Sequence, residues 1–175
     1  MVRATLVVLV GCLSWFVASH SRAEEPKAFS VSAVTGTQAG SEVDYITQRN
    51  EKMTIFIFLQ AEFWDRPLAR YVKVLDTKLE GVKGAEEMQV VAVWLSDDAA
   101  KGKEYLPRAQ MSLNLARTDW TVFTGQKAGP DGWNVDIADH LTAVVVRDGK
   151  ETARFKYKST NDGDVPELIK ALEKN

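Results

Sequence analysis

The residues that most often carry redox chemistry and metal ions are scarce in this sequence. One of its 175 residues is cysteine, Cys12, and two are histidine, His20 and His140. Zinc and copper sites need several cysteine or histidine ligands, so the sequence excludes them. It also lacks the glycine-rich motifs that hold phosphate groups or dinucleotides. We therefore expect no cofactor.

A strong charge of either sign is also lacking. The chain has 22 basic and 24 acidic residues, which gives a net charge of −2. A chain without a basic excess has no electrostatic reason to bind nucleic acid or an anionic membrane surface. We expect neither as a partner.

The first 23 residues have the pattern of a secretory signal peptide. Arg3 gives a positive start, residues 4–18 are almost wholly apolar, and Ser21 and Ala23 are the small residues that a cleavage site requires. We therefore expect an exported protein, periplasmic or secreted, whose mature domain of residues 24–175 does not insert into a membrane. Two alternatives stay open: an uncleaved anchor, and a lipoprotein lipidated at Cys12.

Cleavage after Ala23 would leave a mature chain without any thiol, because Cys12 is the only cysteine. Thiol-disulfide exchange and peroxide reduction both need a thiolate nucleophile. Exported proteins usually have access to disulfides, but this one could form none. The sequence therefore predicts no thiol-disulfide oxidoreductase or peroxidase activity for the mature protein.

Apolar strands alternate with amphipathic helices along the chain, which predicts one α/β domain. An Asp-Gly pair at residues 148–149 predicts a hairpin near the end. We expect a mostly parallel sheet with one antiparallel edge and helices on both faces. Strands are expected at residues 29–35, 53–60, 88–95, 120–124, 141–147 and 152–157, and helices at about 41–50, 68–79, 103–115 and 165–172.

The segment at residues 53–67 joins an apolar strand, MTIFIFLQ, to the turn AEFWDRP. This segment and the order of elements resemble the thioredoxin family, in which the central strand is followed by a segment like A-E-W-C-G-P-C. The resemblance covers about residues 29–174. It implies a thioredoxin-like three-layer sandwich, with a mixed, mostly parallel sheet and a C-terminal hairpin and helix.

The chain departs from the thioredoxin pattern at both halves of the family's redox site. Trp64 stands where the nucleophilic cysteine would be, and Pro67 stands where the resolving cysteine would be. The cis-proline that the family has before its hairpin strand is missing from residues 139–142. The resemblance therefore implies a redox-inactive, exported bacterial thioredoxin-like family that lacks CxxC. It carries no thiol activity over to any residue.

The turn after the central strand is the first candidate for a functional site, because ligands of such sheets bind there. Asp65 has an ordinary explanation as a helix cap, and Arg66 as a solvated side chain. On the functional interpretation, Trp64, Asp65, Arg66 and His140 form a contact surface, since aromatic and arginine side chains anchor interfaces. The sequence leaves both interpretations open.

Two functions are compatible with these residues. We expect a non-enzymatic binding or scaffolding module of the cell envelope, with an envelope protein as its partner. The alternative is a hydrolase that uses Glu62, Asp65 or Asp139 with His140. Such carboxylates would need shifted pKa values, for which the sequence gives no sign.

Calcium is the metal that the residue types still allow, because it needs only oxygen ligands. Turn formation explains the acidic loops without a metal, and neither loop has EF-hand spacing. Trp94 is expected in the core, while Trp120 and Trp133 either pack the long loop down or form an exposed patch. The acidic loops contain Asp131, Asn134, Asp136 and Asp139 in one case, and Asn161, Asp162 and Asp164 in the other.

Overall fold

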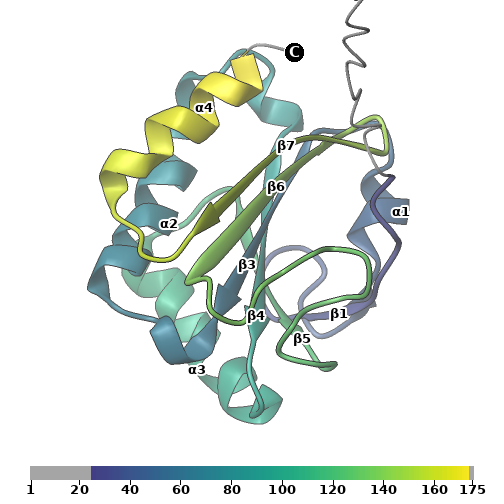
Figure 1. Ribbon diagram of the computed structural model, residues 1–175, viewed down its shortest axis with the longest axis vertical. Helices are drawn as coiled ribbons and strands as arrows, with labels where there is room; N and C mark the ends of the chain where they lie inside the picture. Colours follow the sequence, from purple (N-terminus) through teal and green to yellow (C-terminus); the bar gives the residue numbers. More distant parts are fainter. Residues whose placement is uncertain (1–24, 174–175) are drawn as a thin grey trace, which may run out of the picture.

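The central strand and its neighbours form a seven-stranded mixed sheet in the computed structural model, which describes residues 25–173 (Figure 1). The predicted signal peptide and Cys12 lie outside the described residues. The strands are β1 (Val31–Ala33), β2 (Glu42–Val43), β3 (Thr54–Gln60), β4 (Gln89–Leu95), β5 (Thr118–Phe123), β6 (Leu141–Arg147) and β7 (Lys150–Tyr157). The helices are α1 (Tyr45–Arg49), α2 (Arg66–Lys78), α3 (Ala99–Leu113) and α4 (Val165–Glu173), and the 3-10 turns are η1 (Ala61–Phe63), η2 (Leu79–Gly81), η3 (Ala85–Glu87) and η4 (Asp162–Asp164).

The strands lie in the order β2-β1-β5-β4-β3-β6-β7. Strands β3, β4 and β5 are parallel, and every other neighbouring pair is antiparallel. The predicted mixed α/β sheet with a closing hairpin and helix is confirmed. Antiparallel strands lie at both edges, where one such edge was expected, because β1 and β2 add to the sheet beside β5.

Strand β3 is buried on both of its faces, as its unbroken apolar run predicts. Figure 1 shows α2, α3 and α4 on one side of the sheet and α1 on the other. Ile55, Ile57 and Leu59 point to the side of the three long helices, while Phe56 and Phe58 point to the opposite side. The apolar stripe of α2 packs on the first side, through Leu68, Tyr71, Val72 and Leu75.

The second face of the sheet has little helical cover, because its helix, α1, has only five residues. The loop of residues 124–140 covers the rest and places Trp133 in the core, where the ring is 1% exposed. Phe29 packs on Trp133 with ring centroids 4.9 Å apart. Trp120 is also buried, but on the opposite face of the sheet, so the exposed patch is wrong for both tryptophans and the loop-packing alternative is confirmed for Trp133 alone.

The helix starts follow the capping chemistry of nearby acidic residues. Asp65 caps α2 by accepting a backbone hydrogen bond at 2.9 Å, and Pro67 lies in the first turn, as predicted. The spacing of Asp164 and Glu167 predicts a capping box at the start of α4, and this prediction is wrong. Asn161 and Asp164 form a capping box around η4 instead, because the chain makes a 3-10 turn before α4 begins.

Two further helix starts differ from the prediction. The α3 helix begins before residue 103, because the Asp98 carboxylate accepts a hydrogen bond from the Lys101 N–H at 2.9 Å and caps the helix there. The cap of α1 is Asp44, not Ser41, because Ser41 precedes the short strand β2. In both helices the actual cap, Asp98 or Asp44, lies a few positions from the expected start.

A buried polar cluster fastens α1 to the N-terminal ends of the strands. The Tyr45 hydroxyl donates to the Asp119 carboxylate at 3.2 Å, and Gln89 donates to the same oxygen. Arg49 donates to the Gln89 side chain at 2.8 Å. A Cβ on Gly36 would lie 2.0 Å from the Asp119 carboxylate, and its φ of +82° is also a glycine conformation. The backbone therefore closes directly over Asp119.

Burial raises the pKa of the Asp119 carboxyl, although hydrogen bonds from Tyr45 and Gln89 and the charge of Arg49 partly oppose the shift. A carboxyl with a raised folded-state pKa holds its proton more tightly in the folded protein, so lowering the pH favours folding. We predict that the wild type gains unfolding free energy relative to Asp119→Asn as the pH falls through this pKa. Urea denaturation of both proteins across a pH series measures it, and a constant difference would contradict the assignment.

A second buried carboxylate, Asp76 of α2, holds the start of β5. It accepts hydrogen bonds from the backbone N–H groups of Ala116 and Arg117 at 3.0 and 2.9 Å, and from the Thr118 hydroxyl at 2.7 Å. We predict that Asp76→Ala lowers the free energy of unfolding by about 2–4 kcal/mol, because it leaves buried donors without acceptors. Chemical denaturation tests this against Glu80→Ala, an exposed acid that should change stability little.

Candidate functional site

The turn after β3 gives Phe63 and Trp64 different neighbours. The Phe63 ring stacks on the His140 imidazole with centroids 4.3 Å apart and an interplanar angle of 14°. The backbone of His140 is fixed as well, because its N–H donates to the Tyr157 carbonyl at 2.8 Å and its carbonyl accepts from the Gln60 N–H at 3.4 Å. The structure thus brings His140 to the turn through Phe63, a residue that the sequence analysis did not single out.

Trp64 is half-buried and belongs to an aromatic cluster. Its indole N–H donates to the Tyr105 hydroxyl of α3 at 2.8 Å. Its ring lies edge-to-face with Trp94 and with Trp120, at 5.5 Å from each. The predicted core position of Trp94 is confirmed. Trp64 therefore has its polar group and most of its ring engaged inside the protein.

Tyr105 is the residue of this site that sequence reasoning misplaced. Helical periodicity predicts that Tyr105 lies on the buried face of α3 together with Leu106 and Ala109, but its side chain is 37% exposed. Periodicity gives the face on which a residue lies and not what lies opposite it. Only the approach of α3 to the turn makes the Tyr105 hydroxyl the acceptor for Trp64.

Asp65 and Arg66 have simpler surroundings. The Asp65 carboxylate is occupied as the α2 cap, which agrees with the ordinary explanation. Arg66 is exposed, and within the described part of the chain no carboxylate lies within ion-pair distance of it. Of the four residues expected at a contact surface, Arg66 and His140 are those whose side chains are not already bonded within the fold.

A cavity of about 520 Å³ opens beside the turn, between the C-terminal ends of β3 and β4 and the first half of α3. A smaller hollow of about 260 Å³ lies next to Trp64. Tyr105 and Arg108 line both. The hydrogen bond from Trp64 to Tyr105 therefore lies at the boundary between the two hollows.

The residues expected of a hydrolase do not assemble. Asp139 is 3% exposed and pairs with Lys158 at 2.8 Å, while Asp65 caps α2 and Glu62 is exposed. The hydrogen bond that the Lys158 ammonium group donates to the Asp139 carboxylate raises the pKa of Lys158. Among residues 25–173 no hydrogen bond or ion pair joins the His140 ring to a carboxylate. The arrangement offers no general acid and base in mutual reach.

The acidic loops use their oxygens for their own turns. Asp136 accepts from the Ala138 N–H at 2.9 Å, and that hydrogen bond lowers the pKa of its carboxyl. Asn161 accepts from the Gly163 N–H at 2.7 Å. In the described part of the chain, no group of three histidine, cysteine or acidic residues is arranged to hold a metal ion. Turn formation therefore accounts for Asp136 in one loop and for Asn161 and Asp164 in the other.

Comparison with known proteins gives structural neighbours only, since no family model and no curated protein sequence matches. A DsbF homologue from Corynebacterium diphtheriae has a TM-score of 0.65 and 12% identity, with 89% of each chain covered. A secreted thiol-disulfide isomerase from Corynebacterium glutamicum has a TM-score of 0.58 and 13% identity over 85% of each chain. The bacterioferritin comigratory protein of Xanthomonas campestris, studied for alkyl peroxide reduction, has a TM-score of 0.61 and 8% identity, covering 83% of this chain and 90% of that one.

These neighbours correct the expected function and establish the fold. The expected binding or scaffolding module without thiol redox chemistry, and its hydrolase alternative, are contradicted, because the structural neighbours are thiol-disulfide and peroxide-reducing proteins. At such low identity the likeness shows the architecture alone. The chain has a thioredoxin-like α/β fold.

Proposed function

We propose that this protein acts in thiol-disulfide exchange, and that it recognises a cysteine-containing polypeptide and holds it for reaction. The turn after β3 carries the proposal. It lies at the position in the fold where thioredoxin-like proteins react. The stacking of Phe63 on His140 holds these two rings in place beside the turn. The thiol-disulfide and peroxide-reducing titles of the neighbours support a redox role.

The reacting sulfur atoms in this proposal come from other proteins. Cys12 is the only cysteine of the chain, and residues 25–173 contain none. A thiolate of a separate thiol-disulfide protein attacks the disulfide of the bound polypeptide, forms a mixed disulfide and releases the second thiolate. The second thiol of that protein then resolves the mixed disulfide, so two electrons and two protons pass from it to the polypeptide. The role of the chain in this exchange is to position the polypeptide for the attacking thiolate.

The contact surface in this proposal consists of Phe63, Arg66 and His140. Arg66 is the first residue of α2 and carries an exposed positive charge. The backbone N–H and carbonyl of His140 are both hydrogen-bonded, which fixes the position from which its ring projects. Trp64 and Asp65, which were also expected at this surface, instead stabilise the turn through their hydrogen bonds with Tyr105 and the Leu68 N–H. Arginine and aromatic groups of this kind are frequent anchors of interfaces.

We also propose that the protein is exported and that its partner belongs to the cell envelope. Residues 1–23 have the signal-peptide pattern, and one structural neighbour is described as secreted. In the described range, no helix is both long and apolar enough to span a membrane. Cleavage after Ala23 predicts a mature N-terminus at Glu24 in intact-mass analysis of the exported protein. An N-terminus at a lipidated Cys12 would contradict cleavage at that site.

The exchange role predicts that the protein accelerates disulfide reduction by another protein and does not reduce the disulfide by itself. With dithiothreitol, the purified mature protein should not reduce a disulfide polypeptide above the blank, because it has no thiol. Added to a thiol-disulfide interchange protein of the same envelope, it should accelerate reduction. Arg66→Gln should weaken this effect by about tenfold, the usual result of removing an interface anchor. Stopped aliquots analysed for free thiols give the rates.

Lys78→Gln is the matched control for this experiment, because Lys78 is an exposed cation at the other end of the same helix. It should leave the acceleration unchanged. If no interchange protein of the envelope is accelerated, the proposed role is wrong. Turnover by the uncleaved chain alone that disappears in Cys12→Ser would show instead that the chain supplies its own thiol.

A further inference from the structure

The larger cavity of about 520 Å³ is a site separate from the turn surface, because neither Arg66 nor His140 lines it. Its volume lies within the range of about 300–1,000 Å³ that is usual for small-molecule sites. One wall comes from the end of β3 and η1, and the opposite wall from the end of β4 and the start of α3. Ligands of α/β sheets bind beyond the carboxyl ends of parallel strands, and β3 and β4 are parallel.

The floor of the cavity is aromatic. Trp94 and Tyr105 line it with their ring centroids 6.1 Å apart. The indole N–H of Trp94 has no hydrogen-bond acceptor among the described residues. A Cβ on Gly102 would lie 2.9 Å from the Trp94 ring, so a glycine is what lets α3 pack against this floor. The floor thus offers apolar contact area and one free donor.

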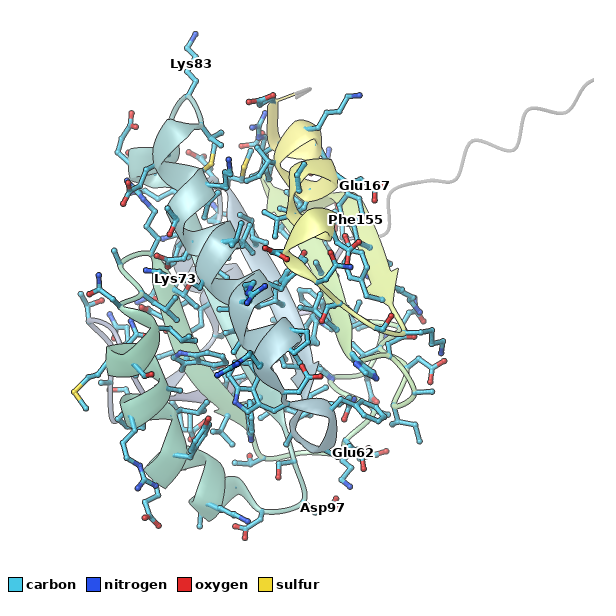
Figure 2. All side chains as sticks on the ribbon, turned by 90° about the vertical axis from the view of Figure 1, so that its left-hand side faces the viewer. Glu62, Lys73, Lys83, Asp97, Phe155 and Glu167 are labelled. Atoms are coloured by element: carbon cyan, nitrogen blue, oxygen red, sulfur yellow. The ribbon has the colours of Figure 1, made fainter. Side chains whose placement is uncertain are left out.

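The rim of the cavity carries both signs of charge, and most of these charges are already neutralised. Asp97 pairs with Lys127 at 2.5 Å, and Glu104 pairs with Arg108 at 3.6 Å. Figure 2 shows Asp97 and Glu62 at the same end of the molecule. Asp98 is the cap of α3.

Two charges of the rim are left over. Glu62 on η1 and Lys101 in the first turn of α3 are exposed, line the cavity and form no ion pair within the described range, although the charge of Glu62 contributes to the raised pKa of Lys127. They come from different elements, so a ligand in the cavity can meet one negative and one positive side chain that form no ion pair. The Lys101 side also has the N-terminus of α3, a 15-residue helix whose dipole favours an anion.

We propose that this cavity binds a small zwitterion with a large apolar side chain, the chemistry of a short apolar peptide with free termini. The carboxylate lies against Lys101, the first turn of α3 and the Trp94 N–H. The ammonium group lies against Glu62. The apolar side chains cover the rings of Trp94 and Tyr105, where removal of apolar area from water supplies most of the binding free energy. The site does not depend on the exchange role proposed above.

Calorimetric titration with leucyl-phenylalanine tests the site, with the N-acetyl and the C-terminal amide forms as analogues that each lack one charge. The wild type should bind the zwitterion, and each analogue should bind about two- to fivefold more weakly, as for the loss of one exposed ion pair. In Glu62→Gln, N-acetylation of the peptide should cause no further loss of affinity. In Lys101→Gln, amidation of the peptide should cause no further loss of affinity. Both residues are exposed, so the variants should fold like the wild type.

The matched controls are Glu167→Gln and Lys83→Gln, which remove exposed charges far from the cavity, toward the other end of the molecule in Figure 2. They should bind all three peptides as the wild type does. The proposal is overturned if leucyl-phenylalanine gives no binding heat at its highest soluble concentration. It is equally overturned if Glu62→Gln and Lys101→Gln respond to the analogues in the same way as the controls.

Discussion

The burial of β3 on both faces is the constraint from which the rest of the structure follows. A strand with no solvent-facing side needs cover above and below, and the side chains of Ile57 and Phe58 point to opposite layers. The α2 helix supplies the first layer directly after the strand. The second layer has to be assembled from α1, the N-terminal segment and a long loop, because no long helix packs there in the described part of the chain. The position of the turn, and hence of the cavity, is set by where β3 ends.

The sequence was sufficient for those features that depend on neighbouring residues. The apolar run of β3, the Asp65 cap and the turn at Asp148 and Gly149 were predictable because each is a local pattern. The start of α3 was not, since several acidic residues could have capped it. The alternation of strands and helices also favoured a mostly parallel sheet, but the antiparallel pairing of β1 with β5 joins segments far apart in the chain.

The candidate site was predictable in place but not in composition. The strand-to-helix turn could be identified from its position in the order of elements. Tyr105 and Lys158 could not be assigned to it, because their partners are brought near only by the packing of α3 and the hairpin. His140 was identified because histidine is rare, yet its neighbour proved to be an aromatic ring and not a carboxylate. Scarcity of a residue type indicates where chemistry could occur, whereas its surroundings decide which chemistry.

The turn after β3 rests on a cluster of aromatic rings. Trp64, Trp94 and Trp120 form a continuous edge-to-face cluster beneath it. Such a cluster gives the turn a rigid base, since each ring limits the rotation of the next. A rigid turn suits recognition of a polypeptide, because little conformational entropy is lost on binding. Trp64, one of these rings, stands at the position of the nucleophilic cysteine in the thioredoxin pattern that the sequence resembles.

Trp133 also limits how the chain can be processed. Its indole N–H donates to the carbonyl of Lys27 at 2.9 Å, and Phe29 closes over its ring. Lys27 and Phe29, which closely follow the predicted cleavage site, are therefore tied to the second hydrophobic layer through Trp133. Trimming the mature chain beyond Lys27 would remove the acceptor of a buried donor and loosen the long loop. The contacts of Trp133 with Lys27 and Phe29 therefore limit how far into the chain a leader could be cut without disturbing the fold.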